Sequence, residues 1–396
     1  MKVLDVTDFY SDRGGGIRSH LDAKGRALAA LGVDHVTLAP GARDGEEALT
    51  AAGSRPAARV IRVQGPPQPY DASYRFLTRT RRAAAAVVAE RPDVLELDSL
   101  YLAARVARRV PRDVAPVRTA FWHSDHVDTH LVPRLAPWLG ARGAERVVAP
   151  AWGAIRALLS QLDATVAASR VQRDKLERHG VPRVHHVPFG VDRGRFRPEA
   201  RSPARRAELL GAGREGAWLL LAVGRLSVEK QWPVVIDAFL ALRRRHDAVL
   251  IVIGEGPERA ALERRAGRDP DVRFHGFEAD RDRFAATLAS ADALLHGCPH
   301  ETFGLGVAEA VACGLPVVVP DAGGAGELAA GPSARRYASG DALACAAAVE
   351  ALLALPAEAR RAAALDAAAR VGTMEDHFRA VVELYRELML RAAHRG

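Results

Sequence analysis

Four charged residues in the carboxy-terminal half of the sequence have the types and spacing to bind a phosphorylated, hydroxyl-rich ligand. Glu301 and Glu309 are separated by seven residues in the segment E-T-F-G-L-G-V-A-E. Arg225 and Lys230 follow the apolar run Trp218–Val223. Carboxylates accept hydrogen bonds from paired hydroxyl groups, and guanidinium and ammonium groups bind phosphate oxygens. Together these residue types suit a sugar or ribose attached to a diphosphate.

Two other roles are open to the pair of carboxylates. The acid and base of a hydrolase flank the substrate, whereas Glu301 and Glu309 lie in one short segment. The alternative for Glu301 is a purely structural role, in which it caps the helix that follows it. Recognition of sugar or ribose hydroxyls fits both residues better, and we favour it.

The backbone between the two acids adds a second kind of contact. The apolar run 291–295 predicts a buried strand, and 305–312 predicts a helix. Phe303, Gly304 and Leu305 lie where the strand's carboxyl end leads into the helix, the usual ligand position in open α/β sheets. Their amides can hold phosphate oxygens, and the two cations supply charge as a diphosphate leaves.

The amino-terminal half contains a histidine-rich loop. The apolar run 117–122 predicts a strand that ends in H-S-D-H, beginning at His123. A histidine there can bond a sugar hydroxyl or relay a proton, and a structural role in the loop is the alternative. Asp125 and His126 follow and are candidates for the acceptor side.

A glycine turn lies between the first predicted strand and helix. Gly14, Gly15 and Gly16 let the backbone approach a phosphate or sugar, with helix amides directed at it. The turn lacks the G-x-G-x-x-G spacing and the ribose-binding acid of a dinucleotide site. A plain tight turn is therefore the alternative.

The surrounding elements predict an α/β protein with two similar halves. A chain of 396 residues favours two domains, and the alternation of strands and helices restarts at Trp218. This pattern fits two Rossmann-like domains facing each other across a cleft. We assign residues 1–195 to the first domain and 196–373 to the second. The amphipathic segment 374–396 predicts a helix that needs a surface to pack on.

Composition and charge exclude several classes. No run approaches the roughly 18–20 apolar residues of a membrane span, and the amino terminus does not resemble a signal peptide. Three cysteines without C-x-x-C spacing provide neither a disulfide framework nor a zinc site. Residues 1–197 contain 31 Lys and Arg and 21 Asp and Glu, so this half of the chain is basic. The remainder contains 25 Lys and Arg and 27 Asp and Glu, so its charges nearly balance. The lack of a span, of a signal peptide and of a disulfide framework leads us to expect a cytoplasmic protein. No basic run is interleaved with aromatics, so we expect that the protein does not bind nucleic acid.

One basic segment raises the question of a membrane surface. Residues 73–91 predict a helix whose first part carries Arg75, Arg79, Arg81 and Arg82. Such a helix can make a peripheral contact with an anionic membrane. A charged face turned to solvent is the alternative.

Six motifs, in order along nearly the whole chain, give the sequence a family resemblance. They are G-G-G-I at Gly14, V-P-F-G-V-D at Val187, V-G-R-L-x-x-E-K at Val223, G-E-G-P at Gly254, E-T-F-G-L-G-V-A-E-A at Glu301 and G-G-A-G-E at Gly323. The chain resembles the retaining, nucleotide-sugar-dependent glycosyltransferases of family 4, the glycogen-synthase-like group with the GT-B fold. The resemblance implies a donor site in the second domain, an acceptor site in the first, and a terminal helix that packs back on the first.

The resemblance also implies roles in the donor site. Arg225 and Lys230 would hold the diphosphate and stabilise its departure. Glu301 would bind the donor sugar and Glu309 the ribose, with the amides of residues 303–305 near the phosphates. Transfer would retain the anomeric configuration and need neither a metal nor another cofactor.

Three residues of the first domain receive implied roles as well. His123 would contact the donor sugar near the reacting carbon. Gly15 and Gly16 would bring the first loop to the diphosphate and sugar.

Some neighbours of Glu301 depart from the family pattern. His296-Gly297 replaces the usual Pro-Ser, and His300 directly precedes the acid. The donor therefore stays open among UDP-, GDP- and ADP-sugars, and no motif identifies the acceptor. A nucleotide-sugar epimerase of the same fold and a non-catalytic nucleotide-sugar-binding protein are the alternative functions.

Overall fold

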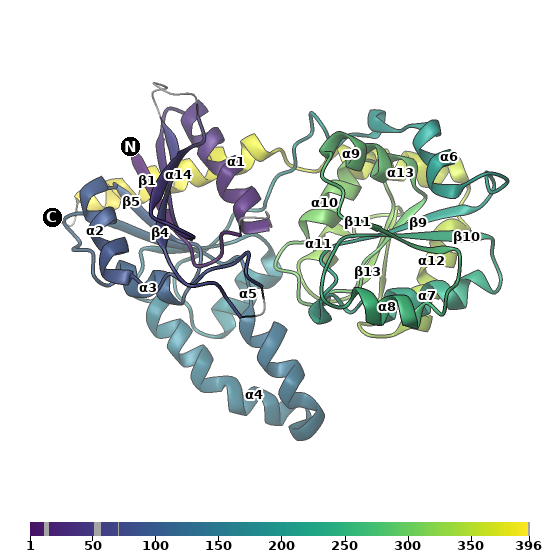
Figure 1. Cartoon of the computed structure of the whole chain (residues 1–396), viewed down its shortest axis with the longest axis horizontal. Helices are drawn as coiled ribbons and strands as arrows, with labels where there is room; N and C mark the ends of the chain where they lie inside the picture. The colour runs from purple at the N-terminus through teal and green to yellow at the C-terminus, as the bar shows by residue number, and fades with distance from the viewer. Residues whose placement is uncertain (12–15, 51–56, 70, 395–396) are drawn as a thin grey trace. The chain divides into compact units, whose positions relative to one another are not determined.

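The chain folds into two compact units, each built on its own sheet (Figure 1). A computed structural model describes residues 1–11, 16–50, 57–69 and 71–394. One unit contains residues 1–188 together with 375–396, and the other contains residues 189–374. Both are α/β units with Rossmann-like parallel sheets, which confirms the predicted fold class.

The first unit contains an eight-stranded sheet with the order β3-β4-β2-β1-β5-β6-β7-β8. Only β3, at one edge, runs antiparallel to its neighbour. The strands are β1 (Lys2–Val6), β2 (Asp34–Gly41), β3 (Gly45–Ala48), β4 (Ala58–Gln64), β5 (Val94–Leu97), β6 (Val117–Phe121), β7 (Ala164–Ala167) and β8 (Val184–His186). The central strands are rich in Val, Leu and Ala because helices cover a doubly wound sheet on both faces.

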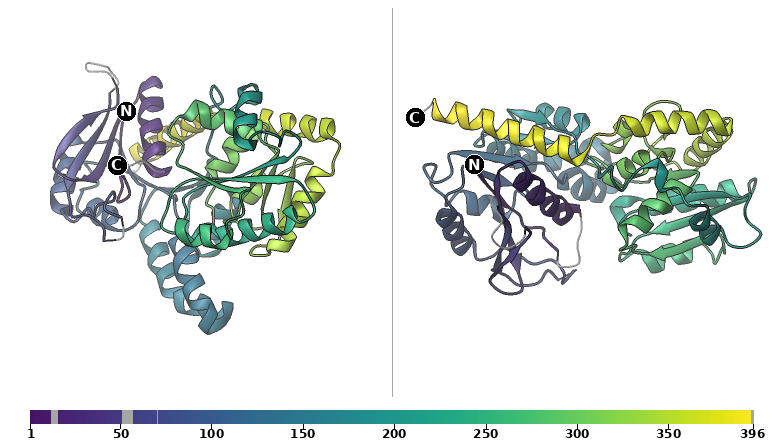
Figure 2. Two further views of the ribbon diagram at one scale, coloured as in Figure 1. Left: turned by 45° about the vertical axis from the view of Figure 1, so that its right-hand side comes forward. Right: turned by 90° about the horizontal axis from the view of Figure 1, so that it is seen from above.

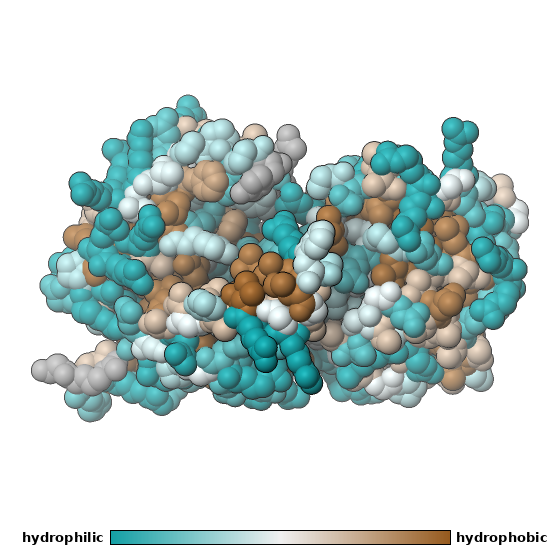
Figure 3. Space-filling view, turned by 90° about the horizontal axis from the view of Figure 1, so that it is seen from below, coloured by the Kyte–Doolittle hydropathy of each residue, from teal (hydrophilic) through white to brown (hydrophobic). Residues whose placement is uncertain are grey.

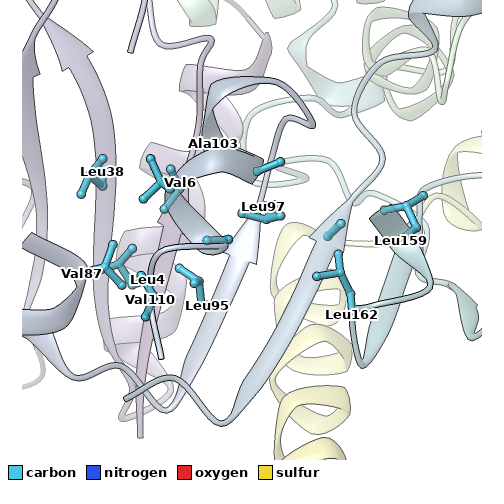
Figure 4. Packing of buried hydrophobic residues seen from close by; sticks show 14 of the residues in the cluster. Leu4, Val6, Leu38, Val87, Leu95, Leu97, Ala103, Val110, Leu159 and Leu162 are labelled. Carbon is cyan, nitrogen blue, oxygen red and sulfur yellow. The ribbon is translucent and has the colours of Figure 1, made fainter. Parts of the chain in front are cut away.

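Helices pack on this sheet and complete the core. They are α1 (Gly16–Ala30), α2 (Thr80–Glu90), α3 (Leu102–Ala107), the π-helical turn η1 (Val127–Leu131), α4 (Val132–Leu159), α5 (Arg170–Arg178) and α14 (Met374–Ala393). Figure 4 shows part of the core, in which Val87 and Val110 pack against Leu4 and Leu95 of the central strands.

The first-unit helix predicted at residues 73–91 begins later in the structure. α2 starts at Thr80, because Arg75 forms an isolated bridge with Pro67 and the side chain of Asp71 holds the amide of Ser73 in a turn. The arginines expected on one helix face are therefore divided between an extended loop and the helix.

α4 is a helical hairpin that the sequence patterns did not reveal. The chain reverses at Gly140, whose φ of 67° and ψ of 167° are not helical. The returning leg buries Val148, Trp152 and Leu159 against the core. Pro137 and Pro150 lie within the legs, and these residues obscure the helical signal in the sequence.

The amphipathic segment at the end of the chain forms the helix α14, which clusters with the first unit (Figure 2). Its Tyr385 hydroxyl accepts a hydrogen bond of 2.9 Å from the buried Lys24 ammonium of α1. Lys24 also donates to Asp5 at 2.9 Å and to Glu96 at 2.6 Å. All three ammonium protons thus have acceptors, which a buried charge requires.

The second unit contains a six-stranded, fully parallel sheet with the order β11-β10-β9-β12-β13-β14. Its strands are β9 (Trp218–Val223), β10 (Ala248–Ile253), β11 (Val272–Gly276), β12 (Ala293–Leu295), β13 (Val317–Pro320) and β14 (Ala334–Tyr337). Its helices are η2 (Pro198–Ala200), α6 (Pro203–Leu210), η3 (Val228–Lys230), α7 (Trp232–Arg243), α8 (Arg259–Arg265), α9 (Arg281–Ser290), α10 (Leu305–Ala312), α11 (Ala325–Leu328), α12 (Ala342–Leu353) and α13 (Ala357–Ala369). α10 has the bounds that the sequence predicted.

The strand order creates a switch point in each sheet. In the first unit β1 lies between β2 and β5, and in the second β9 lies between β10 and β12. At such a point neighbouring loops diverge at the carboxyl edge and leave a crevice for a ligand. Among the described residues no single helix is long and apolar enough to cross a membrane, and α12 and α13, which reach that length together, are bent by 104°.

Candidate functional site

Lys230 and Glu301 meet at the switch point of the second sheet. Lys230 ends η3 in the loop after β9, and Glu301 lies in the loop after β12, which pairs with β9. The Lys230 ammonium donates to Glu301 Oε1 in an ion pair. His296 Nε2 lies 3.3 Å from the same oxygen. The structure therefore brings together two residues that the sequence predicted for one site.

The pair holds both partners in their charged forms. Burial alone would raise the pKa of the Glu301 carboxyl, but Lys230 and His296 outweigh it and lower the pKa well below its usual value. Burial alone would lower the pKa of Lys230, but Glu301 beside it raises the pKa above its usual value. Lys230 is therefore a fixed cation at neutral pH.

The loop between the acids is held in place by close backbone packing. Gly304 adopts a φ of 94° immediately before α10, a conformation that favours glycine. A Cβ on Gly324 would lie 2.5 Å from the Thr302 carbonyl oxygen, and the Gly324 amide donates to the Glu301 carbonyl at 2.7 Å. Phe303 is buried and packs edge-on against Phe189 at 5.3 Å. The first amides of α10, including that of Leu305, have no acceptor within the helix and are available to an anion.

Glu309 has a partner that the sequence patterns did not reveal. The Arg281 guanidinium, at the start of α9, forms an ion pair with Glu309 Oε1. Burial raises the pKa of Glu309, and Arg281 opposes that effect. The same guanidinium lies 4.9 Å from the Phe196 ring centre and 5.0 Å from that of Phe284. Arg281 and Glu309 are 28 residues apart, so only the packing of α9 on α10 identifies the pair.

Arg225 lies in the same loop as Lys230. Its side chain is exposed, and its carbonyl accepts a hydrogen bond of 2.8 Å from Trp232 Nε1. The hydrogen bond from Trp232 attaches the loop to α7.

Two groups of side chains have the composition of a cation site. Ligand atoms of His296, Cys298 and Glu301 lie within 4.8 Å of one another, as do those of Asp5, Glu96 and Asp98. An ammonium group already contacts each set, Lys230 in the first and Lys24 in the second. Its positive charge disfavours a second cation at either place.

In the first unit His123 is held by Asp98, another residue that the sequence patterns did not reveal. β6 and β5 are neighbours, and the loops that follow them bring His123 Nε2 to 2.7 Å from Asp98 Oδ1. Burial and the nearby Lys24 lower the pKa of His123 to about 3. Burial and Asp5 raise the pKa of Asp98 well above its usual range. His123 is therefore neutral near pH 7, a state that can both donate and accept a hydrogen bond.

Asp125 and His126 have structural contacts of their own. Asp125 pairs with Lys175 and accepts a hydrogen bond of 3.1 Å from the Asp128 amide. His126 lies among aromatic rings, 5.7 Å from that of Phe9, and burial lowers its pKa to about 4.

The predicted glycine loop is described only in part. Gly16 is the exposed first residue of α1, and a Cβ there would meet nothing within 4 Å. Gly15 lies outside the described residues.

Family comparisons match both halves of the chain. Residues 14–195 match the model of Glycosyltransferase Family 4, and residues 218–355 match that of Glycosyl transferases group 1.

Two relatives and one solved structure extend these matches. The chain is 36% identical to the GDP-mannose-dependent alpha-(1-6)-phosphatidylinositol dimannoside mannosyltransferase of Mycobacterium tuberculosis, over 81% of this chain and 79% of the relative. It is 28% identical to a GDP-mannose-dependent alpha-mannosyltransferase of Corynebacterium glutamicum, over 82% of this chain and 73% of that relative. The structure of sucrose-phosphate synthase from Thermosynechococcus elongatus superposes with a TM-score of 0.79 at 20% identity, covering 99% of this chain and all of that one. The last likeness concerns the fold alone.

Proposed function

The chain belongs to glycosyltransferase family 4, the group 1 glycosyl transferases with the GT-B fold, and from this premise we propose that it transfers mannose from GDP-mannose. It is a glycosyltransferase that uses a nucleotide sugar. The mannose donor is supported by the two relatives above, both named as GDP-mannose-dependent mannosyltransferases.

The observation that carries the proposal is the ion pair between Lys230 and Glu301 at the switch point of the second sheet. A cation adjoining a hydroxyl-binding carboxylate suits the junction between diphosphate and sugar. In the proposed complex Lys230 and Arg225 hold the diphosphate and stabilise the negative charge that develops as it leaves. Glu301 accepts hydrogen bonds from the mannose hydroxyls.

Other residues complete the proposed donor site. The amides of Phe303, Gly304 and Leu305 bind phosphate oxygens. Glu309 binds the ribose hydroxyls, which requires the Arg281 guanidinium to move aside or to share the carboxylate.

The first unit contributes the remaining groups. Neutral His123 hydrogen-bonds to the donor sugar near the reacting carbon, and the backbone of Gly15 and Gly16 approaches the diphosphate. Asp125 and His126 stay candidates for the acceptor side.

We propose that transfer retains the anomeric configuration and needs no metal. The relatives are named alpha-mannosyltransferases, and the mannose of GDP-mannose is itself α-linked, so an α-linked product means retention. Lys230 and Arg225 supply the positive charge at the leaving group that a metal ion supplies in other enzymes.

For the acceptor we propose a phosphorylated glycolipid of the kind that the mycobacterial relative is named for. A pocket of about 360 Å³ lies beyond the carboxyl end of β4 in the first unit, lined in part by Gly65, Arg75 and Arg79. Arg75 Nη1 donates to the Gly65 carbonyl at 3.1 Å, but its buried Nε–H has no acceptor among the described residues. An unpaired buried donor beside a pocket suits an anionic headgroup.

Donor binding and product analysis test the proposal. A ligand at 100 times its Kd stabilises the folded chain by about 2.7 kcal/mol, so GDP-mannose should raise the melting temperature more than UDP- or ADP-sugars do. NMR of a reaction with GDP-mannose and phosphatidylinositol mannosides should show an α-mannosyl product, with the rate unchanged by EDTA.

Different failures have different meanings. A stronger thermal shift with UDP- or ADP-sugars would overturn the donor, and a β-linked product would overturn retention. Conversion of the donor alone into another sugar nucleotide would indicate an epimerase. Binding without turnover, over the acceptor series, would contradict catalysis.

A further inference from the structure

The α4 hairpin is firmly attached to the first unit at its base. Trp152 stacks on the His179 ring at a centroid distance of 3.9 Å, and Leu159 is buried in the core. Lys175 of α5 pairs with both Asp125 and Asp128 at the entry to the hairpin. From this base the hairpin projects away from the sheet (Figures 1 and 2).

The far end of the hairpin exposes large apolar side chains. We call residues 131–147 the α4 tip. Trp138 is 87% exposed, Val147 56% and Leu139 48%. Figure 3, a view from the side toward which α4 projects, shows apolar residues gathered on the near face beside hydrophilic side chains. Such a group of exposed apolar side chains marks an interaction surface.

The α4 tip also carries positive charge without counterions. Arg134, Arg142 and Arg146 are exposed, and among the described residues none of them has an ion-pair partner. Glu145 is the single acid between residues 131 and 147. The basic residues at the start of α2 differ, because Arg82 of α2 and Arg79 just before the helix both pair with Asp44.

We propose that the α4 tip docks the protein on an anionic membrane surface. Trp138 and Leu139, next to the reversal at Gly140, enter the interface, where an indole ring is favoured. The three arginines contact lipid phosphates, each strengthening binding by about fivefold at low salt. The contact is peripheral and adds a lipid-binding function that does not depend on which nucleotide sugar is the donor.

A membrane fits the α4 tip better than a second copy of the chain. In a two-fold dimer the same patch faces itself, so arginines of one copy would lie against arginines of the other. An anionic lipid surface neutralises these charges while it covers the apolar side chains.

Vesicle binding of the full chain tests the proposal. Flotation with vesicles of equal phosphatidylcholine and phosphatidylglycerol should recover the protein, and vesicles of phosphatidylcholine alone should recover at least about tenfold less. Trp138→Ser with Leu139→Ser should weaken binding at least about tenfold. Changing Arg134, Arg142 and Arg146 to Gln should weaken it by about two orders of magnitude.

Matched controls separate the α4 tip from general effects. Phe277→Ser and Leu343→Ser remove two other exposed apolar side chains and should leave binding unchanged. Changing Arg81 and Arg82 to Gln tests α2 as the membrane face and should have a smaller effect than the α4 change. All these positions are exposed, so the melting temperature should stay unchanged.

Tryptophan emission reports the insertion directly. Trp138 is strongly exposed, whereas Trp122, Trp152 and Trp232 are buried. Vesicles should shift the emission of the protein to the blue, and Trp138→Phe should abolish most of that shift.

Three results would overturn the proposal. The first is that both α4 variants bind vesicles as well as the unchanged protein does, and the second is that only the α2 variant loses binding. The third is that the protein does not bind vesicles but forms a concentration-dependent dimer, which Trp138→Ser abolishes. Turnover with a water-soluble mannoside acceptor keeps this test separate from the proposed reaction. If the docking proposal is wrong, turnover of the soluble acceptor is still observed. If the proposed donor is wrong, binding to vesicles is still observed.

Discussion

At the scale of single residues, the candidate donor site consists of charges that the protein has already paired. Lys230 contacts Glu301 and Arg281 contacts Glu309. In the proposed complex the ligand's diphosphate and hydroxyl groups join or replace these contacts. A paired site of this kind holds its side chains in position before the donor arrives, which reduces the entropy lost on binding.

Lys230→Ala is the residue-scale prediction. It removes the fixed cation at the proposed leaving group, so we expect kcat to fall by at least about 100-fold. Glu229→Gln changes the charge of the neighbouring residue in the same loop and should change kcat by less than about threefold. Steady-state rates with GDP-mannose measure both variants. Near-normal turnover in Lys230→Ala would contradict the assigned role.

At the scale of elements, α14 is attached to the first unit by a buried polar contact as well as by packing. Phe378, Val381 and Leu388 bury its apolar face, and the Tyr385 hydroxyl accepts the third proton of the Lys24 ammonium. The ammonium is almost fully buried, so a missing acceptor cannot be replaced by bulk water.

Tyr385→Phe is the element-scale prediction. It leaves one buried N–H of Lys24 without an acceptor, so the free energy of unfolding should fall by about 1–3 kcal/mol. Tyr101→Phe alters a tyrosine whose side chain is exposed and should cost less than about 0.5 kcal/mol. Urea unfolding measures both variants. Equal stability of the two would show that packing alone holds α14.

At the scale of the whole molecule, buried histidines connect stability to pH. His20, His123 and His377 lie close together, with the His20 ring 5.0 Å from that of His123 and 5.6 Å from that of His377. Burial lowers the pKa of all three, to about 3 for His123 and about 4 for His377. In the unfolded chain these histidines take up protons below about pH 6.5, whereas in the folded chain they stay neutral to a lower pH.

Acid lability is the corresponding prediction. Because the folded pKa values lie below the unfolded ones, the stabilisation is complete above about pH 6.5 and is lost as the pH falls toward about 4. Each histidine contributes a slope of up to about 1.4 kcal/mol per pH unit in that window. His20→Phe should flatten the slope measured by urea unfolding between pH 7 and pH 5, and exposed His394→Gln should not. The same slope in the His20 variant would contradict the assignment.

Local sequence patterns predicted much of the fold, both members of the Lys230–Glu301 pair and one member, Glu309, of the Arg281–Glu309 pair. The α10 bounds, the two parallel sheets and the family came from glycine turns, apolar runs and ordered motifs. Glu301 and Lys230 could be identified because each lies in a short motif at a strand end. The limit of α2 was wrong because side-chain hydrogen bonds and a bridge to Pro67 override the helical composition before Thr80.

The sequence by itself determined which residue types stand at the carboxyl ends of the strands, because that depends on patterns a few residues long. The tertiary structure decided which partners those residues have. Asp98 beside His123, Arg281 beside Glu309 and Lys24 beside Tyr385 are pairs whose members are 25, 28 and 361 residues apart. The exposure of Trp138 was likewise settled by packing, because the returning leg of α4 buries Trp152 in the core and leaves the end of the hairpin in solvent.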